Sequence, residues 1–263
     1  MSGDGELAGR VAIVTGGHSG IGLSTCRMLA AEGAAIAMFG RSVETGEAAV
    51  EELRGAGADV EFVSVDLADP ATIEPAVQQV VDRFGGVDIL VNNAGARAIG
   101  KQLGRATVLD IDLASWDYLQ AVNLRAPFLL TQAVARHMVE QGRGGRVVNV
   151  TSSSAFLPHG SAHYAASKAG LTALTRNAAA DLGPHGITVN AVAPALTRTQ
   201  YRVDAFGGDQ SAFDKAVRKG PMANMTQTVV EPEDVAAVIT FLCLPASRSI
   251  TAQTIHTDAG IVV

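Results

Sequence analysis

Cysteine is scarce in this sequence, in which Cys26 and Cys243 are the only two. Neither belongs to a Cys-x-x-Cys motif or has histidine and acidic neighbours at ligand spacing, so nothing in the sequence supports a structural zinc site. Both fall in predicted helices among apolar residues, where a buried thiol usually acts as a small hydrophobic side chain. We therefore expect no metal ion.

An excess of basic residues is also lacking. The chain has 20 lysines and arginines against 26 aspartates and glutamates, which gives a formal net charge of −6. Nucleic acids and acidic membrane surfaces attract proteins with clustered Lys and Arg. The composition therefore argues against both as the main partner, and any anion must be bound at a local site.

Long apolar segments are missing as well. Residues 1–7 are acidic and contain no apolar stretch typical of a signal peptide, and no unbroken apolar run is long enough to cross a bilayer. We expect a cytoplasmic protein. No repeat, biased tract or linker interrupts the chain, and one α/β domain can run to ~250 residues. Residues 1–263 are therefore expected to form a single dinucleotide-binding and catalytic domain.

What the sequence does contain is an alternation of short β-branched or apolar runs with alanine-rich amphipathic stretches, the pattern of βαβ units. It predicts an α/β fold, a doubly wound parallel sheet of the Rossmann type. The expected strands are 11–15, 35–39, 61–66, 89–91, 146–151, 188–193 and 254–257. The expected helices are 23–31, 43–54, 71–84, 115 to about 141 with Ser115 as N-cap, one that carries Tyr164 and ends at Leu182, and 233–242.

Residues 195–230 are irregular and mixed in polarity. A segment of this length is too long for an ordinary connection, which favours a lid over the substrate within the same domain. Ligands of open α/β sheets lie outside the carboxyl ends of the strands. We therefore expect the lid and the motifs described next to share one rim of the sheet.

Two motifs carry chemistry. Residues 15–22 read Thr-Gly-Gly-His-Ser-Gly-Ile-Gly between a predicted strand and a predicted helix, where free backbone N–H groups hold a dinucleotide pyrophosphate. Tyr164 and Lys168 stand four residues apart, so on a helix they share a face, and the ammonium favours the ionised phenol. Without such help a phenol of pKa ~10 is a poor acid or base near neutral pH.

The order and spacing of these motifs, over nearly the whole chain, resemble a compact short-chain dehydrogenase/reductase, similar to 3-oxoacyl-carrier-protein reductases and related alcohol dehydrogenases. Further residues match motifs of that family: Asp66 after Val65, Asn92-Asn93-Ala94-Gly95, Asn123, Ser152, and Asn190-Ala-Val-Ala-Pro194. The resemblance implies an NAD(P)-dependent oxidoreductase that moves a hydride between the nicotinamide and a carbonyl or secondary alcohol, a ketoreductase in the reducing direction.

The same resemblance implies roles for single residues. Tyr164 would be the general acid/base and Ser152 would stabilise the substrate oxygen. Lys168 would lower the pKa of the tyrosine and hold the nicotinamide ribose, and Asn123 would order a proton-relay water. The implied coenzyme contacts are Gly16, Ser19, Gly20, Ile21, Gly22, Arg41, Asp66, Leu67, Asn93, Ala94, Gly95, Tyr164, Lys168, Pro194, Thr197 and Thr199. The family also implies a homotetramer, and Ala165, Ala169, Ala173 and Ala180 would permit close helix contact.

Coenzyme choice depends on the end of the second predicted strand, where NAD enzymes usually place an acidic residue. This chain has Gly40 there, followed by Arg41, whose guanidinium suits a 2′-phosphate. The family's other phosphate-binding base is missing, because Ser19 occupies its position. The sequence therefore favours NADP and leaves NAD open.

Several features depart from the family pattern. Ser152 stands one residue closer to Tyr164 than is usual, and Ala195 and Thr197 replace the usual Gly and apolar residue after Pro194. The basic run 97–105 and the segment 222–229 look like insertions near the substrate. For 97–105 a solvated loop is the favoured interpretation, and contact of Arg97, Lys101 and Arg105 with an acidic substrate or carrier is the alternative. The segment 222–229 is assigned to the lid. Phe156, Leu157, Phe213, Met222 and Met225 are candidates for an apolar pocket wall or for the core.

Two other classes of protein share some of these sequence features. A coenzyme-binding sensor or assembly subunit without turnover would need the glycine turn but would gain nothing from Ser152 and Asn123. A sugar-nucleotide epimerase would bring a larger carboxyl-terminal domain, for which this chain has no room. His18, His159 and His163 have no placed partner and are taken as incidental. The identity of the substrate depends on lid side chains and stays open.

Overall fold

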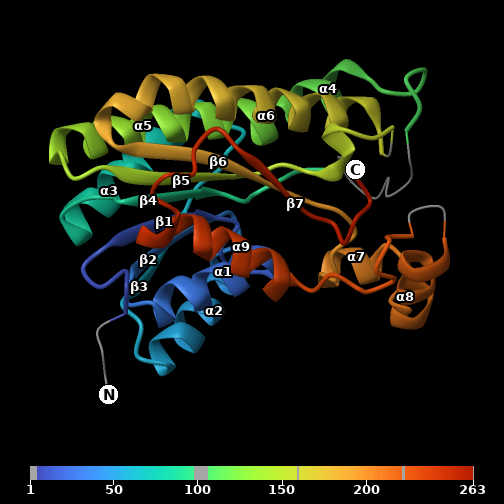
Figure 1. The fold of residues 1–263 in the computed structure, drawn as a ribbon, viewed down its shortest axis with the longest axis horizontal. Coiled ribbons are helices and arrows are strands. Elements are labelled where there is room, and N and C mark those ends of the chain that lie inside the picture. Colours follow the sequence, from blue (N-terminus) through green and yellow to red (C-terminus); the bar gives the residue numbers. More distant parts are fainter. Residues whose placement is uncertain (1–4, 98–105, 159, 221–222, 263) are drawn as a thin grey trace.

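A seven-stranded parallel sheet runs through the centre of the molecule (Figure 1). The computed structural model describes residues 5–97, 106–158, 160–220 and 223–262. Its strands are β1 (Val11–Thr15), β2 (Ala35–Gly40), β3 (Val60–Ser64), β4 (Ile89–Asn92), β5 (Gly145–Val150), β6 (Ile187–Pro194) and β7 (Thr254–Thr257). They lie in the order β3-β2-β1-β4-β5-β6-β7, which confirms the predicted fold class. The chain order reverses between β1 and β4, where a doubly wound sheet binds its ligand.

Helices cover both faces of the sheet. In Figure 1, α5 (Ala126–Gln141) and α6 (Ala162–Leu182) lie over one face, and α1 (Gly20–Ala31), α2 (Val43–Gly55) and α9 (Pro232–Cys243) over the other. Successive side chains of a strand point to opposite faces. Accordingly Ile13 packs in the core shared with α3 (Ile73–Phe84) and α5. Ala12 and Val14 pack in the core shared with α1 and α9.

Most predicted boundaries agree with the structure to within one or two residues. Strands 11–15 and 254–257 match in full, and Cys26 and Cys243 are buried as expected. Helix α1 begins at Gly20 rather than at residue 23, so the last part of the glycine turn already belongs to the helix. Strand β3 ends at Ser64, which places Asp66 beyond the strand.

The single helix predicted from Ser115 to about residue 141 is wrong in two respects. Asp112, not Ser115, is the N-cap of α4 (Leu113–Gln120), because its carboxylate accepts a hydrogen bond from the Ser115 N–H at 2.7 Å. A π-helical turn, Ala121–Arg125, then separates α4 from α5. Such turns occur mostly as single insertions in α-helices, frequently at functional sites.

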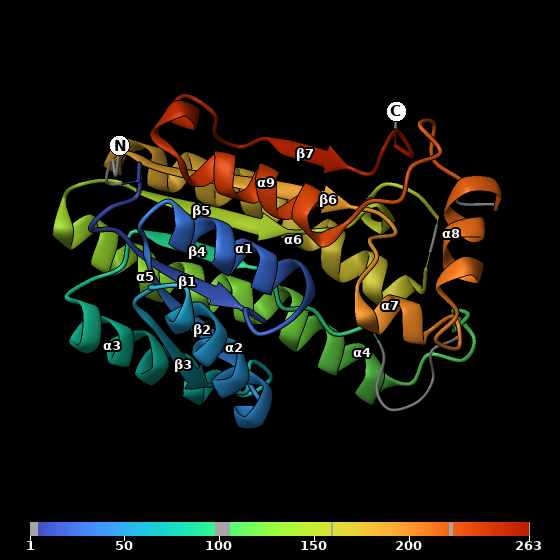
Figure 2. The same ribbon diagram turned by 90° about the horizontal axis from the view of Figure 1, so that it is seen from below.

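The segment 195–230 is also more regular than predicted. It contains α7 (Gln200–Asp204) and α8 (Gln210–Lys219), whose caps are the side chains of Thr199 and Asp209. Figure 2 shows both helices beyond the carboxyl ends of the central strands. Within the residues that the structure describes, no helix combines the length and apolar character needed to cross a membrane.

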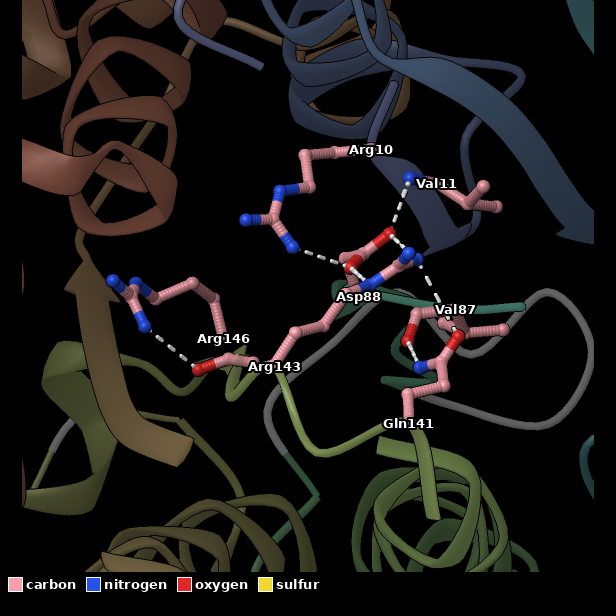
Figure 3. A network of polar contacts seen from close by, with 8 residues as sticks. Arg10, Val11, Val87, Asp88, Gln141, Arg143 and Arg146 are labelled. Carbon is pink, nitrogen blue, oxygen red and sulfur yellow. Dashed lines mark hydrogen bonds and ion pairs between the residues drawn. The ribbon is translucent and has the colours of Figure 1, made fainter. Parts of the chain in front are cut away.

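At the opposite ends of the central strands, a buried carboxylate joins the amino ends of β1, β4 and β5 (Figure 3). Asp88 accepts hydrogen bonds from the Val11 N–H at 3.0 Å and from Arg10 at 2.8 Å, and it forms a bidentate pair with Arg143 at 2.7 and 2.9 Å. Its side chain is 3% exposed, while the two arginines are 41% and 45% exposed. The carboxylate therefore binds three chain segments together, while both cations remain in contact with water.

We expect Asp88→Ala to lower the free energy of unfolding by about 2–3 kcal/mol, because the buried Val11 N–H loses its acceptor while the arginines remain partly solvated. Denaturant unfolding measures this change. Asp181→Ala is the matched control, since Asp181 is an exposed aspartate at the far end of α6, and surface substitutions usually change stability by less than about 0.5 kcal/mol. Equal stability of the two variants would contradict the role assigned to Asp88.

Candidate active site

The glycine turn between β1 and α1 closes tightly on itself. Gly16 and Gly20 have φ angles of +64° and +51°, a backbone conformation that favours glycine. A Cβ atom at Gly22 would overlap the carbonyl oxygen of Gly16, so no other residue fits there without opening the turn. Ser19 precedes α1 with an extended backbone and makes no side-chain capping bond. The first N–H groups of the helix therefore form an anion-binding terminus beside the turn.

The end of β4 braces this turn. The Asn93 side chain donates a hydrogen bond to the Thr15 carbonyl at 2.9 Å, and the Thr15 hydroxyl accepts bonds from the Asn93 and Ala94 N–H groups, each at 2.9 Å. On the other side, a Cβ atom at Gly95 would lie 3.4 Å from the Lys168 Nζ and 3.6 Å from the Asn123 Oδ1. The strand-end signature thus joins the glycine turn to the helix that carries Tyr164.

A cavity of about 480 Å³ extends from the glycine turn to Tyr164. Ser152, Tyr164 and Lys168 line it together with almost every predicted coenzyme contact: Gly16, Ser19, Gly20, Ile21, Arg41, Asp66, Leu67, Asn93, Ala94, Gly95, Pro194, Thr197 and Thr199. Gly22 and Asn123 are not among the lining residues. Gly22 shapes the turn from behind, and Asn123 lies fully buried below Ala96.

Tyr164 and Lys168 lie on α6 and are 7% and 3% exposed. The Lys168 ammonium donates a hydrogen bond to the carbonyl of Val150 at the end of β5, at 2.8 Å. Ser152 follows β5 and caps a short 3-10 turn, in which its hydroxyl accepts the Ser154 N–H at 3.2 Å. The end of β5 therefore positions both the serine and the lysine beside Tyr164.

Asn123 lies within the π turn, and most hydrogen-bonding groups of its side chain are bonded to other protein groups. Its Oδ1 accepts the Ala96 N–H at 2.7 Å, and its Nδ2 donates to the Ala96 carbonyl at 2.8 Å and to the Ser167 hydroxyl at 3.1 Å. Both amide donors are thus used, and one acceptor lone pair remains. A water-ordering role for this residue would therefore have to use that lone pair or the backbone of the π turn.

The phenol of Tyr164 has an unusual electrostatic environment. Burial raises its pKa, but the charges of Arg97, Lys168 and Arg202 and the nearby Ser152 hydroxyl outweigh burial and lower the pKa to about 8. The Arg97 guanidinium lies 4.5 Å from the centre of the Tyr164 ring. Burial lowers the pKa of Lys168, as does Arg97, whereas Tyr164 raises it.

Sequence reasoning missed part of this arrangement. Lys168 was expected to act alone on the tyrosine, whereas Arg97 and Arg202 also act on it. Arg97 was noted in the basic run 97–105, of which residues 98–105 lie outside the described residues. Arg202 gave no signal, because it lies in the segment that was interpreted as irregular.

The far end of the cavity lies beyond β2 and β3. The Asp66 carboxylate accepts the Ala68 N–H at 3.0 Å, and Arg41 donates to the Tyr118 hydroxyl at 3.1 Å. A Cβ atom at Gly40 would lie 2.6 Å from the Nδ1 of His18, so the imidazole occupies the space of a side chain at residue 40. That Nδ1 is buried and has no hydrogen-bond partner among the described residues.

The remaining wall comes from the segment after β6. Thr197 pairs with Val230, and the Thr199 hydroxyl accepts the Arg202 N–H at 3.4 Å. The Thr199 methyl would be 3.1 Å from a Cβ atom at Gly20, so this segment touches the glycine turn directly. Of the two alternatives left open for Phe213, the structure shows the core, since this residue is fully buried in a separate small cluster with Leu196 and Val217. None of Phe156, Leu157 and Met225 lines the cavity, and Met222 and His159 lie outside the described residues.

This combination of a switch-point glycine turn and a buried Tyr/Lys pair defines the class of dinucleotide-binding oxidoreductases. Comparison with known proteins agrees. A family model described as short chain dehydrogenase matches residues 10–208. The chain therefore belongs to the short-chain dehydrogenase/reductase family.

Individual relatives extend over almost the whole chain. It is 36% identical to the short-chain reductase protein NovJ of Streptomyces niveus, over 95% of this chain and 93% of the relative. It is 34% identical to the 3-oxoacyl-[acyl-carrier-protein] reductase FabG of Thermotoga maritima, over 98% and 100%. A solved blue fluorescent protein from a metagenomic library, in complex with NADPH, is 34% identical with a TM-score of 0.84, covering 98% of this chain and 100% of that one.

Proposed function

We propose that this chain is an NAD(P)-dependent oxidoreductase that interconverts a carbonyl compound and a secondary alcohol, with Tyr164 as the general acid/base. The observation that carries the proposal is the buried phenol, whose pKa of about 8 lies near the pH at which a catalytic acid works best. It faces the same cavity as the glycine turn. A residue that only packed would need neither property.

The cavity fits a dinucleotide. The turn closed by Gly22 and the N-terminus of α1 would hold the pyrophosphate, Asp66 and Leu67 would border the adenine, and Pro194, Thr197 and Thr199 would border the nicotinamide. Lys168 has three donors and uses one on Val150, which leaves two for ribose hydroxyls and water. When bound, the reduced coenzyme supplies the hydride, so reduction consumes one hydride and one proton and gives the alcohol and the oxidised coenzyme.

The protein's own residues handle the proton. In reduction, negative charge develops on the carbonyl oxygen, where the Ser152 hydroxyl and the Tyr164 phenol would donate hydrogen bonds. Tyr164 then transfers its proton to that oxygen, because Lys168 and Arg97 stabilise the phenolate left behind. A water beside Asn123 and Lys168 would return the proton from solvent.

The lid is a further part of this proposal. Residues 195–230 would cover the substrate, because α7 contributes Gln200, Tyr201 and Arg202 to the cavity. Arg198, near the start of the lid, forms an ion pair with Asp214 of α8 at 2.9 Å and a second one with Glu231, just after the lid, at 3.4 Å. The segment would therefore move as a unit rather than as separate loops.

NADP is the proposed coenzyme. An acidic side chain at residue 40 would select NAD, but Gly40 carries none and His18 fills its place. Arg41 lines the cavity at this end, bonded among the described residues to a neutral hydroxyl rather than to a carboxylate. Its charge is thus available to a 2′-phosphate. The related structure in complex with NADPH supports the same choice.

Titration with NADPH and with NADH, followed by nicotinamide fluorescence, tests the proposal. We expect Arg41→Ala to weaken NADPH at least about tenfold, because a charge-assisted bond to phosphate is lost, and to change NADH little. Arg248→Ala, which removes an exposed arginine outside the cavity, should change neither. Equal weakening of both coenzymes by Arg41→Ala would remove the basis for NADP. No binding of either coenzyme would overturn the oxidoreductase proposal.

A further inference from the structure

Two arginines converge on the catalytic end of the cavity. Arg97 follows the β4 strand-end signature, and Arg202 lies on α7 in the lid. Both line the cavity with Tyr164. Arg97 stacks on the tyrosine ring at 4.5 Å, and burial together with the Arg97 charge lowers the pKa of Arg202 to about 10. Both charges therefore lie at the end of the cavity that holds the reacting group, and both are partly removed from water.

Neither guanidinium has a hydrogen bond or ion pair to a described residue. Among the other described arginines of intermediate exposure, Arg198 pairs with Asp214 and Glu231 and Arg10 pairs with Asp88, whereas Arg146, at the amino ends of the strands, contacts only the Gly145 carbonyl. Among the described lining residues Asp66 is the only acidic one, and it follows the edge strand β3, far along the sheet from α6. Because buried charges are normally paired, this pair lacks an anion.

The coenzyme does not provide that anion at this position. Its pyrophosphate would lie on the glycine turn and the start of α1, whereas Arg97 lies on the ring of the residue that protonates the substrate oxygen. An anion bound by Arg97 must therefore lie within a few bonds of the reacting carbonyl. A planar guanidinium binds carboxylate and phosphate in a bidentate way, and two such groups from different segments would clamp one compact anion.

We propose that Arg97 and Arg202 form an anion subsite for the substrate, so that the chain acts on oxo acids or on other carbonyl compounds that carry a carboxylate or phosphate a few bonds from the carbonyl. This inference rests on the proposed function. It names the substrate class of the same site, and it assigns to Arg202, on the lid, the closing of the lid over a charged substrate.

Binding to the complex with oxidised coenzyme tests the subsite without turnover, because an oxo acid cannot be reduced there. Calorimetric titration of the NADP⁺ complex, or the NAD⁺ complex if that coenzyme binds better, would compare acetoacetate with its uncharged methyl ester. It would also compare dihydroxyacetone phosphate with dihydroxyacetone. We expect at least one anion to bind about 10- to 100-fold more tightly than its neutral partner. The pair that discriminates identifies carboxylate or phosphate.

Variants assign the effect to the two arginines. Arg97→Gln and Arg202→Gln should each reduce the anion-to-neutral ratio about tenfold or more, while Arg248→Gln, at an exposed arginine outside the cavity, should keep the wild-type ratio. The ratio separates binding from any change in the pKa of Tyr164, which affects turnover of acid and ester alike. Circular dichroism and coenzyme affinity show whether each variant is folded. The anion-to-neutral ratio of the wild type tests the subsite even if a variant does not fold.

Three results would overturn the subsite: equal binding of the charged and neutral probes, an unchanged ratio in both variants, or a parallel loss of coenzyme affinity, which would assign the arginines to the coenzyme. Failure of the proposed function looks different. In that case the wild type would bind coenzyme and prefer the anion, yet oxidise no reduced coenzyme with any of the four carbonyl probes.

Discussion

Tyr164→Phe should lower the rate of carbonyl reduction by about 10²- to 10⁴-fold, the contribution usual for a positioned acid or base. Phenylalanine keeps the buried ring on which Arg97 stacks at 4.5 Å and removes only the hydroxyl, so packing and the arginine contact are preserved. Steady-state coenzyme oxidation with a reducible carbonyl compound measures the loss. Coenzyme affinity should be retained, because the glycine turn and Asp66 are untouched.

This variant also decides between two classes of protein. A coenzyme-binding sensor or assembly subunit would show no turnover in the wild type and no change in Tyr164→Phe. An enzyme that oxidised the coenzyme equally well without the phenol would refute the proposed mechanism while leaving the family assignment intact. Only a large loss of turnover with coenzyme binding preserved agrees with the role proposed for Tyr164.

Lys168→Met should have the second-largest effect, a loss on the order of 100-fold near neutral pH. The ammonium lowers the pKa of Tyr164 and is fixed by the Val150 carbonyl at 2.8 Å. Without it the phenol holds its proton more tightly, although the charge of Arg97 remains. Coenzyme affinity should fall as well, since two ribose donors are lost.

The dependence of the two reaction directions on pH tests the effect of Lys168 on the pKa of Tyr164. Alcohol oxidation needs the phenolate, so kcat/KM of the wild type should rise as the pH increases through about 8, the pKa of Tyr164. Carbonyl reduction needs the protonated phenol and should fall over the same range. In Lys168→Met both midpoints should move to higher pH. A lower rate with unmoved midpoints would mean that Lys168 acts only by binding the ribose.

Much of this site was predictable because it is encoded in local spacing. The strand Val11–Thr15 ends in the glycine turn, and Tyr164 and Lys168 share a helix face by simple periodicity. The N-cap of α4 was equally predictable, because an aspartate, Asp112, stands three residues before Ser115 and aspartate is a preferred N-cap residue. The prediction of Ser115 assigned the cap to the wrong one of two suitable residues.

Other features depend on contacts between distant segments, which the sequence does not display. The π turn around Asn123 has no recognisable composition, and it forms where that side chain bonds to Ala96. His18 and Gly40 are far apart in the chain, so their contact in the cavity requires the pairing of β1 with β2. Arg202 became part of the site only because α7 folds back toward Tyr164.

The hydrogen bonds and ion pairs of Asp88 with Val11, Arg10 and Arg143 bear on how the substrate specificity of this protein can be changed. They join the strands at their amino ends, whereas every lining residue discussed above lies at or beyond the opposite ends. Mutagenesis of the lid and the cavity rim can therefore explore new specificities without drawing on the interactions that anchor the sheet. Libraries that randomise only the exposed residues of α7 and α8, and keep buried Phe213 and Val217 and the Arg198–Asp214 ion pair, should accordingly retain a high proportion of folded members.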